Sequence, residues 1–181
     1  IEVETSIQRL FFYAAWADKF DGSARSVPLK AIALVMNEAI GNCGVICDDR
    51  YPLLGFISAM APLFATGNRS IIIPSEPFSP IVTDFCQVLD TSDVPPGTVN
   101  ILTGKHTDLA IELASHMDIE SVWSFSTSDV SRDIEKASVS NLKRTWVSNG
   151  EKRDWYNEES QGKQFLTNST ENKTIWIPYG E

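Results

Sequence analysis

The chain has 181 residues, 43% of them hydrophobic, which suffices for one domain with a sizeable core and is too few for two ordinary domains. Fifteen basic residues against 24 acidic ones leave a net charge of −9, which opposes binding to phosphate backbones and to anionic membrane surfaces. We therefore expect no nucleic-acid partner, and we interpret the acidity as the solvated surface of a cytoplasmic protein.

The cysteine and hydrophobic patterns exclude two further kinds of site. Three cysteines form no CxxC pair and lie far in sequence from both histidines, so we expect no metal site. The longest apolar runs, such as residues 53–65, are shorter than the roughly 20 residues that cross a bilayer. We therefore expect no membrane insertion.

The first predicted element is a helix. Apolar residues recur at helical spacing over residues 3–20, and a turn at Asp21-Gly22 ends the run. We interpret the segment from that turn to Cys43 as a loop. Residues 43–47 then predict a strand, and the apolar stretch after Pro52 predicts a helix that runs through Phe64.

The strand and helix pattern repeats along the chain. Further strands are predicted at residues 70–73, 99–102, 122–125 and 143–147, and helices at residues 81–89, 108–115 and 129–137. Such alternation is typical of βαβ units. We predict an α/β fold, a doubly wound, Rossmann-like parallel sheet of about five strands with helices on both faces. Its successive strands should contain Val45, Ile72, Ile101, Val122 and Trp146.

The composition changes after Asn149. Residues 151–164 are polar and charged, and residues 174–179 predict a last strand. We therefore divide the chain into residues 1–150, which hold the predicted sheet, and residues 151–181, a polar surface excursion that ends in a strand.

A doubly wound sheet raises the question of a nucleotide site, but the chain has neither GxGxxG nor GxxxxGK[ST]. Instead, a series of segments in the same order resembles the aldehyde dehydrogenase superfamily from about residue 9 to residue 152. The most specific are RLFFYAAWADK at residues 9–19, IGNCG at residues 40–44 and PPGTVNILTG at residues 95–104. The resemblance implies an NAD-binding type of domain over residues 1–150.

The catalytic positions of the family are replaced in this chain. The resembling enzymes use a cysteine nucleophile, a glutamate base and an asparagine that holds the oxyanion. Arg50 stands where the asparagine of the family's PWNFP belongs, and Ser148 stands where the glutamate of LELGG belongs. No cysteine follows Cys86, and we interpret the three present as structural. The resemblance therefore implies no catalytic residue in this chain.

The cofactor positions are only partly kept. Ile73 replaces the ribose-binding lysine of KPAE, and serines replace both glycines of FTGSTEVG, at Ser126 and Ser131. The remaining candidates for cofactor binding are Glu76, Thr127 and Ser128. For the two hydroxyl residues, capping of the helix near Asp129 is the favoured role. We expect no bound cofactor, and NAD is the one candidate.

Within the superfamily, the chain is most similar to the second, C-terminal, cysteine-less domain of family 16 aldehyde dehydrogenases. The resemblance implies a degenerate, non-catalytic module that serves a structural role, self-association or docking of a protein partner. One alternative is a fragment of a working NAD(P)-dependent aldehyde dehydrogenase. Another is a cofactor-binding sensor without chemistry, which would depend on Glu76, Thr127 and Ser128.

Overall fold

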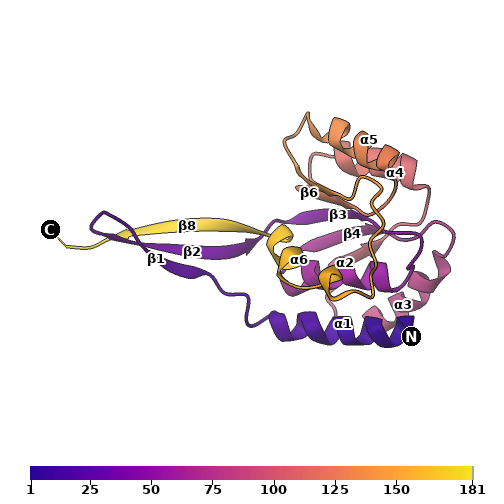
Figure 1. The fold of residues 1–181 in the computed structure, drawn as a ribbon, viewed down its shortest axis with the longest axis horizontal. Helices are drawn as coiled ribbons and strands as arrows, with labels where there is room; N and C mark the ends of the chain where they lie inside the picture. The colour runs from indigo at the N-terminus through magenta and orange to yellow at the C-terminus, as the bar shows by residue number, and fades with distance from the viewer. Residues whose placement is uncertain (181) are drawn as a thin grey trace.

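A five-stranded parallel sheet forms the centre of the molecule (Figure 1). The computed structural model describes residues 1–180. The strand order is β5-β4-β3-β6-β7, and every neighbouring pair is parallel. The predicted fold class is therefore confirmed, and each of the five predicted strands is present. Their bounds are Asn42–Ile46 (β3), Arg69–Ile73 (β4), Val99–Ile101 (β5), Ser121–Ser124 (β6) and Arg144–Val147 (β7).

Helices cover both faces of this sheet. On one face, α2 and α3 pack with Val45 and Ile72, and Tyr13 of α1 joins the same core. On the other face, α4 and α5 pack against Ile46 and Val122. The two apolar layers explain why the strands carry hydrophobic residues on both faces. The helices span Glu2–Trp16 (α1), Leu54–Ala65 (α2), Pro80–Asp90 (α3), His106–Ser115 (α4) and Ser128–Ser138 (α5).

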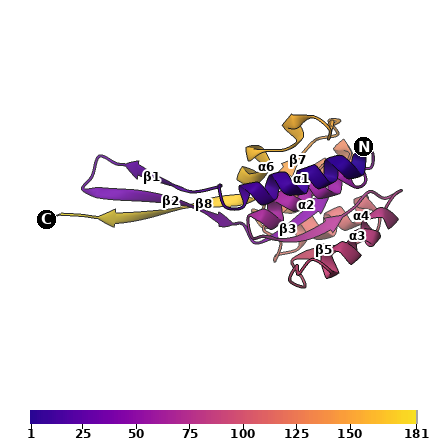
Figure 2. The same cartoon turned by 90° about the horizontal axis from the view of Figure 1, so that it is seen from below.

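A second, antiparallel sheet forms an arm that projects from the body (Figures 1 and 2). Its order is β1-β2-β8, with bounds Ser23–Ser26, Ala31–Ala39 and Thr170–Pro178. The predicted loop between residues 21 and 43 is therefore wrong. Strand β2 pairs along its whole length with β8, from Ala31↔Pro178 to Ala39↔Thr170. Because the partner strand lies far along the chain, local sequence carried little information about this pairing.

The polar stretch after residue 150 returns to the body instead of running free over the surface. It contains a short 3-10 helix, Glu158–Ser160 (η1), and a helix, Lys163–Asn168 (α6). Trp155, Phe165 and Leu166 are fully buried in the core that α1 and α2 share. Of these, Trp155 lies within the polar residues 151–164, so the interpretation of that stretch as a surface excursion is wrong at Trp155. The division of the chain at residue 150 stays a prediction.

Two side chains of α1 hold this stretch in place. The buried guanidinium of Arg9 donates hydrogen bonds to the carbonyl oxygens of Trp155, at 2.9 Å, and of Ser160. The hydroxyl of Tyr13 accepts a hydrogen bond from the Gly162 N–H at 3.2 Å. Burial lowers the pKa of Arg9 and raises that of Tyr13. The first and last parts of the chain are thus joined in one core.

Over residues 1–180, no helix has both the length and the apolar character needed to cross a membrane. Helix α2, the most apolar, has 12 residues.

Candidate functional site

The carboxyl ends of the parallel strands bring the predicted site residues to one edge of the sheet, as expected for a doubly wound fold. A pocket of about 180 Å³ opens there, and both Arg50 and Thr127 line it. Ser148 does not line this pocket, but its hydroxyl donates to the carbonyl oxygen of Ser126, which does, at 3.3 Å. Glu76 follows β4, and its N–H donates to Oδ1 of Asp49, a residue that lines the pocket, at 2.9 Å.

Arg50 is held by a neighbouring carboxylate. Its Nε donates to Asp48 Oδ1 at 3.1 Å, and its Nη2 lies 2.5 Å from Asp48 Oδ2. The hydrogen bond with Asp48 raises the pKa of Arg50 above its ordinary value. Asp48 is itself buried and also accepts a hydrogen bond from Nε1 of Trp155 at 3.3 Å. Arg50 therefore neutralises the buried carboxylate of Asp48, and Asp48 in turn connects Arg50 to Trp155 in the core.

Glu76 is also engaged, with a residue that the sequence did not single out. Its carboxylate accepts the N–H of His106, the first residue of α4. His106 is buried, and its Nε2 lies 2.8 Å from the Pro74 carbonyl oxygen. Because a carbonyl only accepts, Nε2 carries the proton, and in the neutral ring Nδ1 accepts from the Ser126 hydroxyl at 3.2 Å. His106 thus ties the loops after β4 and β6 together.

Helix α5 begins at this edge, and its N-terminus is capped from within the chain. The Thr127 hydroxyl accepts the N–H of Val130 at 3.4 Å, which confirms the predicted capping role. Gly150, with a φ of +79°, passes beside the first turn. A Cβ added to Gly150 would lie 3.0 Å from the Ser128 backbone nitrogen. The segment after β7 therefore lies close against the first turn of α5, beside the Ser128 N–H.

Two further replaced positions lie in the interior. Ile73 is fully buried in the apolar cluster with Ile46, Val130 and Ile134. Ser131 is also fully buried, and its hydroxyl has no hydrogen-bond partner among the described residues. Both side chains act in the packing of α5 against the sheet.

Residues 1–156 match the aldehyde dehydrogenase family. The chain belongs to this family. It is 34% identical over 140 residues to omega-crystallin of Enteroctopus dofleini and 32% identical over 153 residues to cytosolic aldehyde dehydrogenase 1 of Mus musculus. These matches cover 76% and 84% of this chain but 28% and 30% of the two relatives. The chain therefore spans less than a third of their length.

Solved aldehyde dehydrogenase structures share the fold. PnpE from Pseudomonas sp. WBC-3 superposes with a TM-score of 0.78 at 27% identity, over 81% of this chain and 30% of that protein. Lactaldehyde dehydrogenase from Escherichia coli superposes with a TM-score of 0.77 at 22% identity, over 81% of this chain and 31% of that protein. The body of this aldehyde dehydrogenase family member thus follows the family fold.

The cysteines of this family member pack in its interior. Cys43 and Cys47 are buried, whereas Cys86 is partly exposed, and none of the three is in a disulfide. Burial raises the pKa of the Cys43 thiol from 9.0 to about 12, and burial with the nearby Asp48 and Asp49 raises that of Cys47. Over residues 1–180, no cluster of three or more metal-ligating side chains is present.

These pKa values predict the order in which the thiols react. At pH 8 a thiol with a pKa near 12 is thiolate in about one molecule in ten thousand, so Cys43 and Cys47 should resist iodoacetamide while Cys86 is alkylated. Because folding raises both pKa values, their contribution to stability is complete below pH 9 and decreases above it. Mass mapping of alkylated peptides tests the order, and rapid native labelling of Cys47 would contradict it.

Proposed function

We propose that this chain is a non-catalytic member of the aldehyde dehydrogenase family that serves assembly, as the resemblance to the C-terminal domain of family 16 suggests. The arm carries the proposal. Cross-strand neighbours on β2 and β8 place apolar side chains on one face of the arm, where they are half exposed. We call this the apolar arm face; it consists of Ile32, Leu34, Met36, Ile175 and Ile177.

A second copy of the chain is the occupant we propose for this face. Among the described residues β8 pairs only with β2, so the outer edge of its nine residues is open. An open antiparallel edge beside an apolar face is self-complementary, because two copies related by a twofold axis present the same groups to each other. Pairing two arms would cover the apolar face and the strand edge in one interface.

The candidate site supports the non-catalytic half of the proposal. Arg50 is committed to Asp48, and Ser148 offers neither the charge nor the pKa range of a general base. The pocket at the start of α5 also fits a dinucleotide poorly. The pocket of about 180 Å³ is smaller than ordinary ligand sites of roughly 300–1,000 Å³. Glu76 accepts a hydrogen bond from His106, and Gly150 lies close against the first turn of α5.

The second candidate function is a fragment of a working NAD(P)-dependent aldehyde dehydrogenase. It is favoured by relatives whose names are those of aldehyde dehydrogenases and by the short span of the match, 30% of the mouse protein. A longer chain that contains this segment and reduces NAD+ with an aldehyde would favour it. We place either form in the cytoplasm, because three cysteines outside disulfides suit a reducing compartment.

Replacing Ile177 with lysine tests the assembly role. The charge would lie on the apolar arm face, opposite Ile32 on the neighbouring strand, so the variant should sediment as a monomer where the unmodified chain sediments as a dimer or larger species. The matched control is Leu142→Lys, because Leu142 is 93% exposed outside the arm. Analytical ultracentrifugation over a range of concentrations gives the result. A chain that stays monomeric, or equal effects of the two lysines, would reject the arm as the interface.

A further inference from the structure

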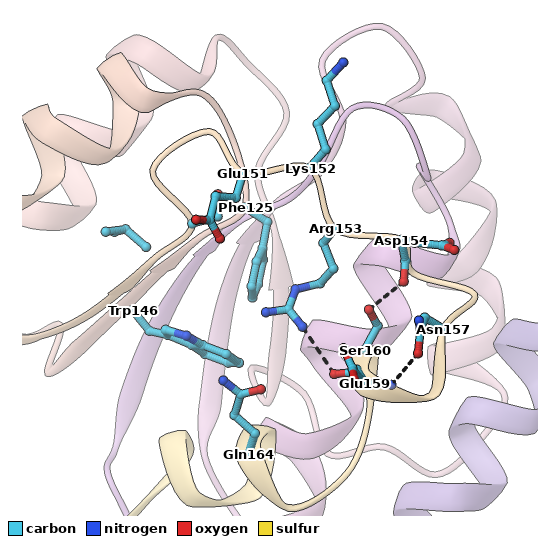
Figure 3. Close-up of a pocket in the computed structure, with 12 residues that line it drawn as sticks. Phe125, Trp146, Glu151, Lys152, Arg153, Asp154, Asn157, Glu159, Ser160 and Gln164 are labelled. Atoms are coloured by element: carbon cyan, nitrogen blue, oxygen red, sulfur yellow. Dashed lines mark hydrogen bonds between the residues drawn. The ribbon is translucent and has the colours of Figure 1, made fainter.

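A second pocket, larger than the one at the start of α5, lies beside the end of β7. It has a volume of about 390 Å³, within the range of small-molecule sites. Phe125 and Trp146 form an aromatic wall, Gln164 rises toward it from α6, and Arg153 extends its guanidinium into the space between them (Figure 3). We call it the Arg153 pocket. The side chain of Lys152 points away from it.

Arg153 is a partly buried cation surrounded by aromatic rings. Its guanidinium carbon lies 5.4 Å from the ring centre of Phe165, and the ring centres of Phe125, Trp146 and Trp155 all lie within 5.8 Å of it. Burial lowers the pKa of Arg153, and the charges of Glu151 and Glu159 offset part of this effect.

Most N–H donors of the Arg153 guanidinium have no hydrogen-bond acceptor among the described residues. Nη1 donates to the Glu159 carbonyl oxygen at 3.3 Å, and no carboxylate lies within ion-pair distance over residues 1–180. An arginine has five N–H donors in the plane of the guanidinium, while ring contacts use its faces. A planar edge with several free donors is the geometry that binds a carboxylate at two points.

We propose that the Arg153 pocket binds a small organic monocarboxylate. The carboxylate accepts two hydrogen bonds from Arg153, and the apolar part of the ligand lies against Trp146 and Phe125. Three acidic residues, Glu151, Asp154 and Glu159, also line the pocket. Their charge favours a ligand with one negative charge over a dianion such as phosphate. This site is separate from the apolar arm face and does not depend on the assembly role.

The aromatic rings and acidic residues also resemble a site for an organic cation, but Arg153 already occupies the space between the rings. A second cation would have to displace it and would leave its charge without the aromatic contacts. The observed position of Arg153 therefore favours the carboxylate, and the cation becomes an outcome of the test.

Three probes of one shape separate these possibilities: 3-phenylpropanoate, its neutral amide, and phenylethyltrimethylammonium. Calorimetry with the unmodified chain, together with quenching of its intrinsic tryptophan fluorescence, should show binding of the carboxylate and about tenfold or greater weakening for the amide. No carboxylate binding, equal binding of the amide, or preferential binding of the ammonium would overturn the proposal.

Two variants locate the site. Arg153→Gln should weaken carboxylate binding about tenfold or more, and Arg132→Gln, which changes an exposed arginine of α5, should leave it unchanged. Because Arg153 also contacts aromatic residues of the core, its replacement could disturb the fold. Gln164→Glu is a second variant that leaves Arg153 in place. The new carboxylate should pair with Arg153 and weaken probe binding by a similar factor while the chain stays folded. Unchanged affinity in Gln164→Glu would reject the site.

Discussion

Replacing Trp155 with alanine is expected to lower the free energy of unfolding by about 3–5 kcal/mol. The indole is fully buried, donates to Asp48 at 3.3 Å and packs edge-on against Phe125, with ring centres 5.0 Å apart. Its removal opens a cavity and also takes one hydrogen bond from a buried carboxylate. Equilibrium unfolding in urea, monitored by circular dichroism, gives the change.

The neighbouring residue provides the control for this measurement. Tyr156 is 42% exposed and makes one ring contact, with Tyr51, so Tyr156→Ala should cost less than about 1.5 kcal/mol. A large difference between the two variants places residues 151–168 in the folding unit of the sheet. If Trp155→Ala were as mild as Tyr156→Ala, the stretch would not be part of the core.

The second large effect concerns NAD+. The unmodified chain is expected to bind NAD+ at millimolar concentration or more weakly, because the resemblance implies that several cofactor contacts of the family are replaced at once. Each 1.4 kcal/mol of lost binding free energy is about tenfold in affinity. Replacing Ser126 and Ser131 with glycine should raise the affinity about tenfold or more, because glycine in place of Ser126, which lines the pocket, permits closer approach of the backbone to a pyrophosphate. Ser131 is fully buried and is replaced together with Ser126 to restore both glycines of the family motif. Ile73→Lys is left out of this variant, since it would place an ammonium among Ile46 and Ile134.

Ser138→Gly is the matched control for this variant. Ser138 is buried, its hydroxyl also lacks a partner among the described residues, and it lies at the other end of α5. Replacing Ser138 with glycine should lower the stability of α5 about as much as replacing Ser131 does, and it should leave NAD+ affinity unchanged. If the double glycine variant gains nothing over this control, the serines do not limit cofactor binding.

The central sheet could be predicted because each of its strands and helices has its own hydrophobic pattern in the local sequence. Runs of β-branched residues such as those around Ile72, separated by amphipathic helices, specify buried parallel strands without knowledge of their partners. The capping role of Thr127 was equally visible, since a hydroxyl residue precedes the helix. The resemblance to the family then placed Arg50 and Ser148 at the same edge, where the structure has them.

The arm and the returning stretch could not be predicted in the same way. Strand β2 is specified by β8, from which more than a hundred residues separate it. Trp155 lies among charged residues, so its segment has no hydrophobic periodicity that would predict burial. A single tryptophan in such a polar stretch was the one feature that could have indicated it. His106 gave no signal as a single histidine, because its contacts with Pro74, Glu76 and Ser126 exist only after three loops meet.

Calorimetric titration of the unmodified chain with NAD+ and NADP+ tests the proposed non-catalytic role most directly. A catalytically active aldehyde dehydrogenase titrated under the same conditions serves as the positive control. We predict no saturable heat below millimolar cofactor and no reduction of NAD+ when a simple aldehyde is added. Binding at micromolar concentration would contradict the decay of the site and favour the sensor, and turnover that disappears on replacing one cysteine would contradict the non-catalytic assignment altogether.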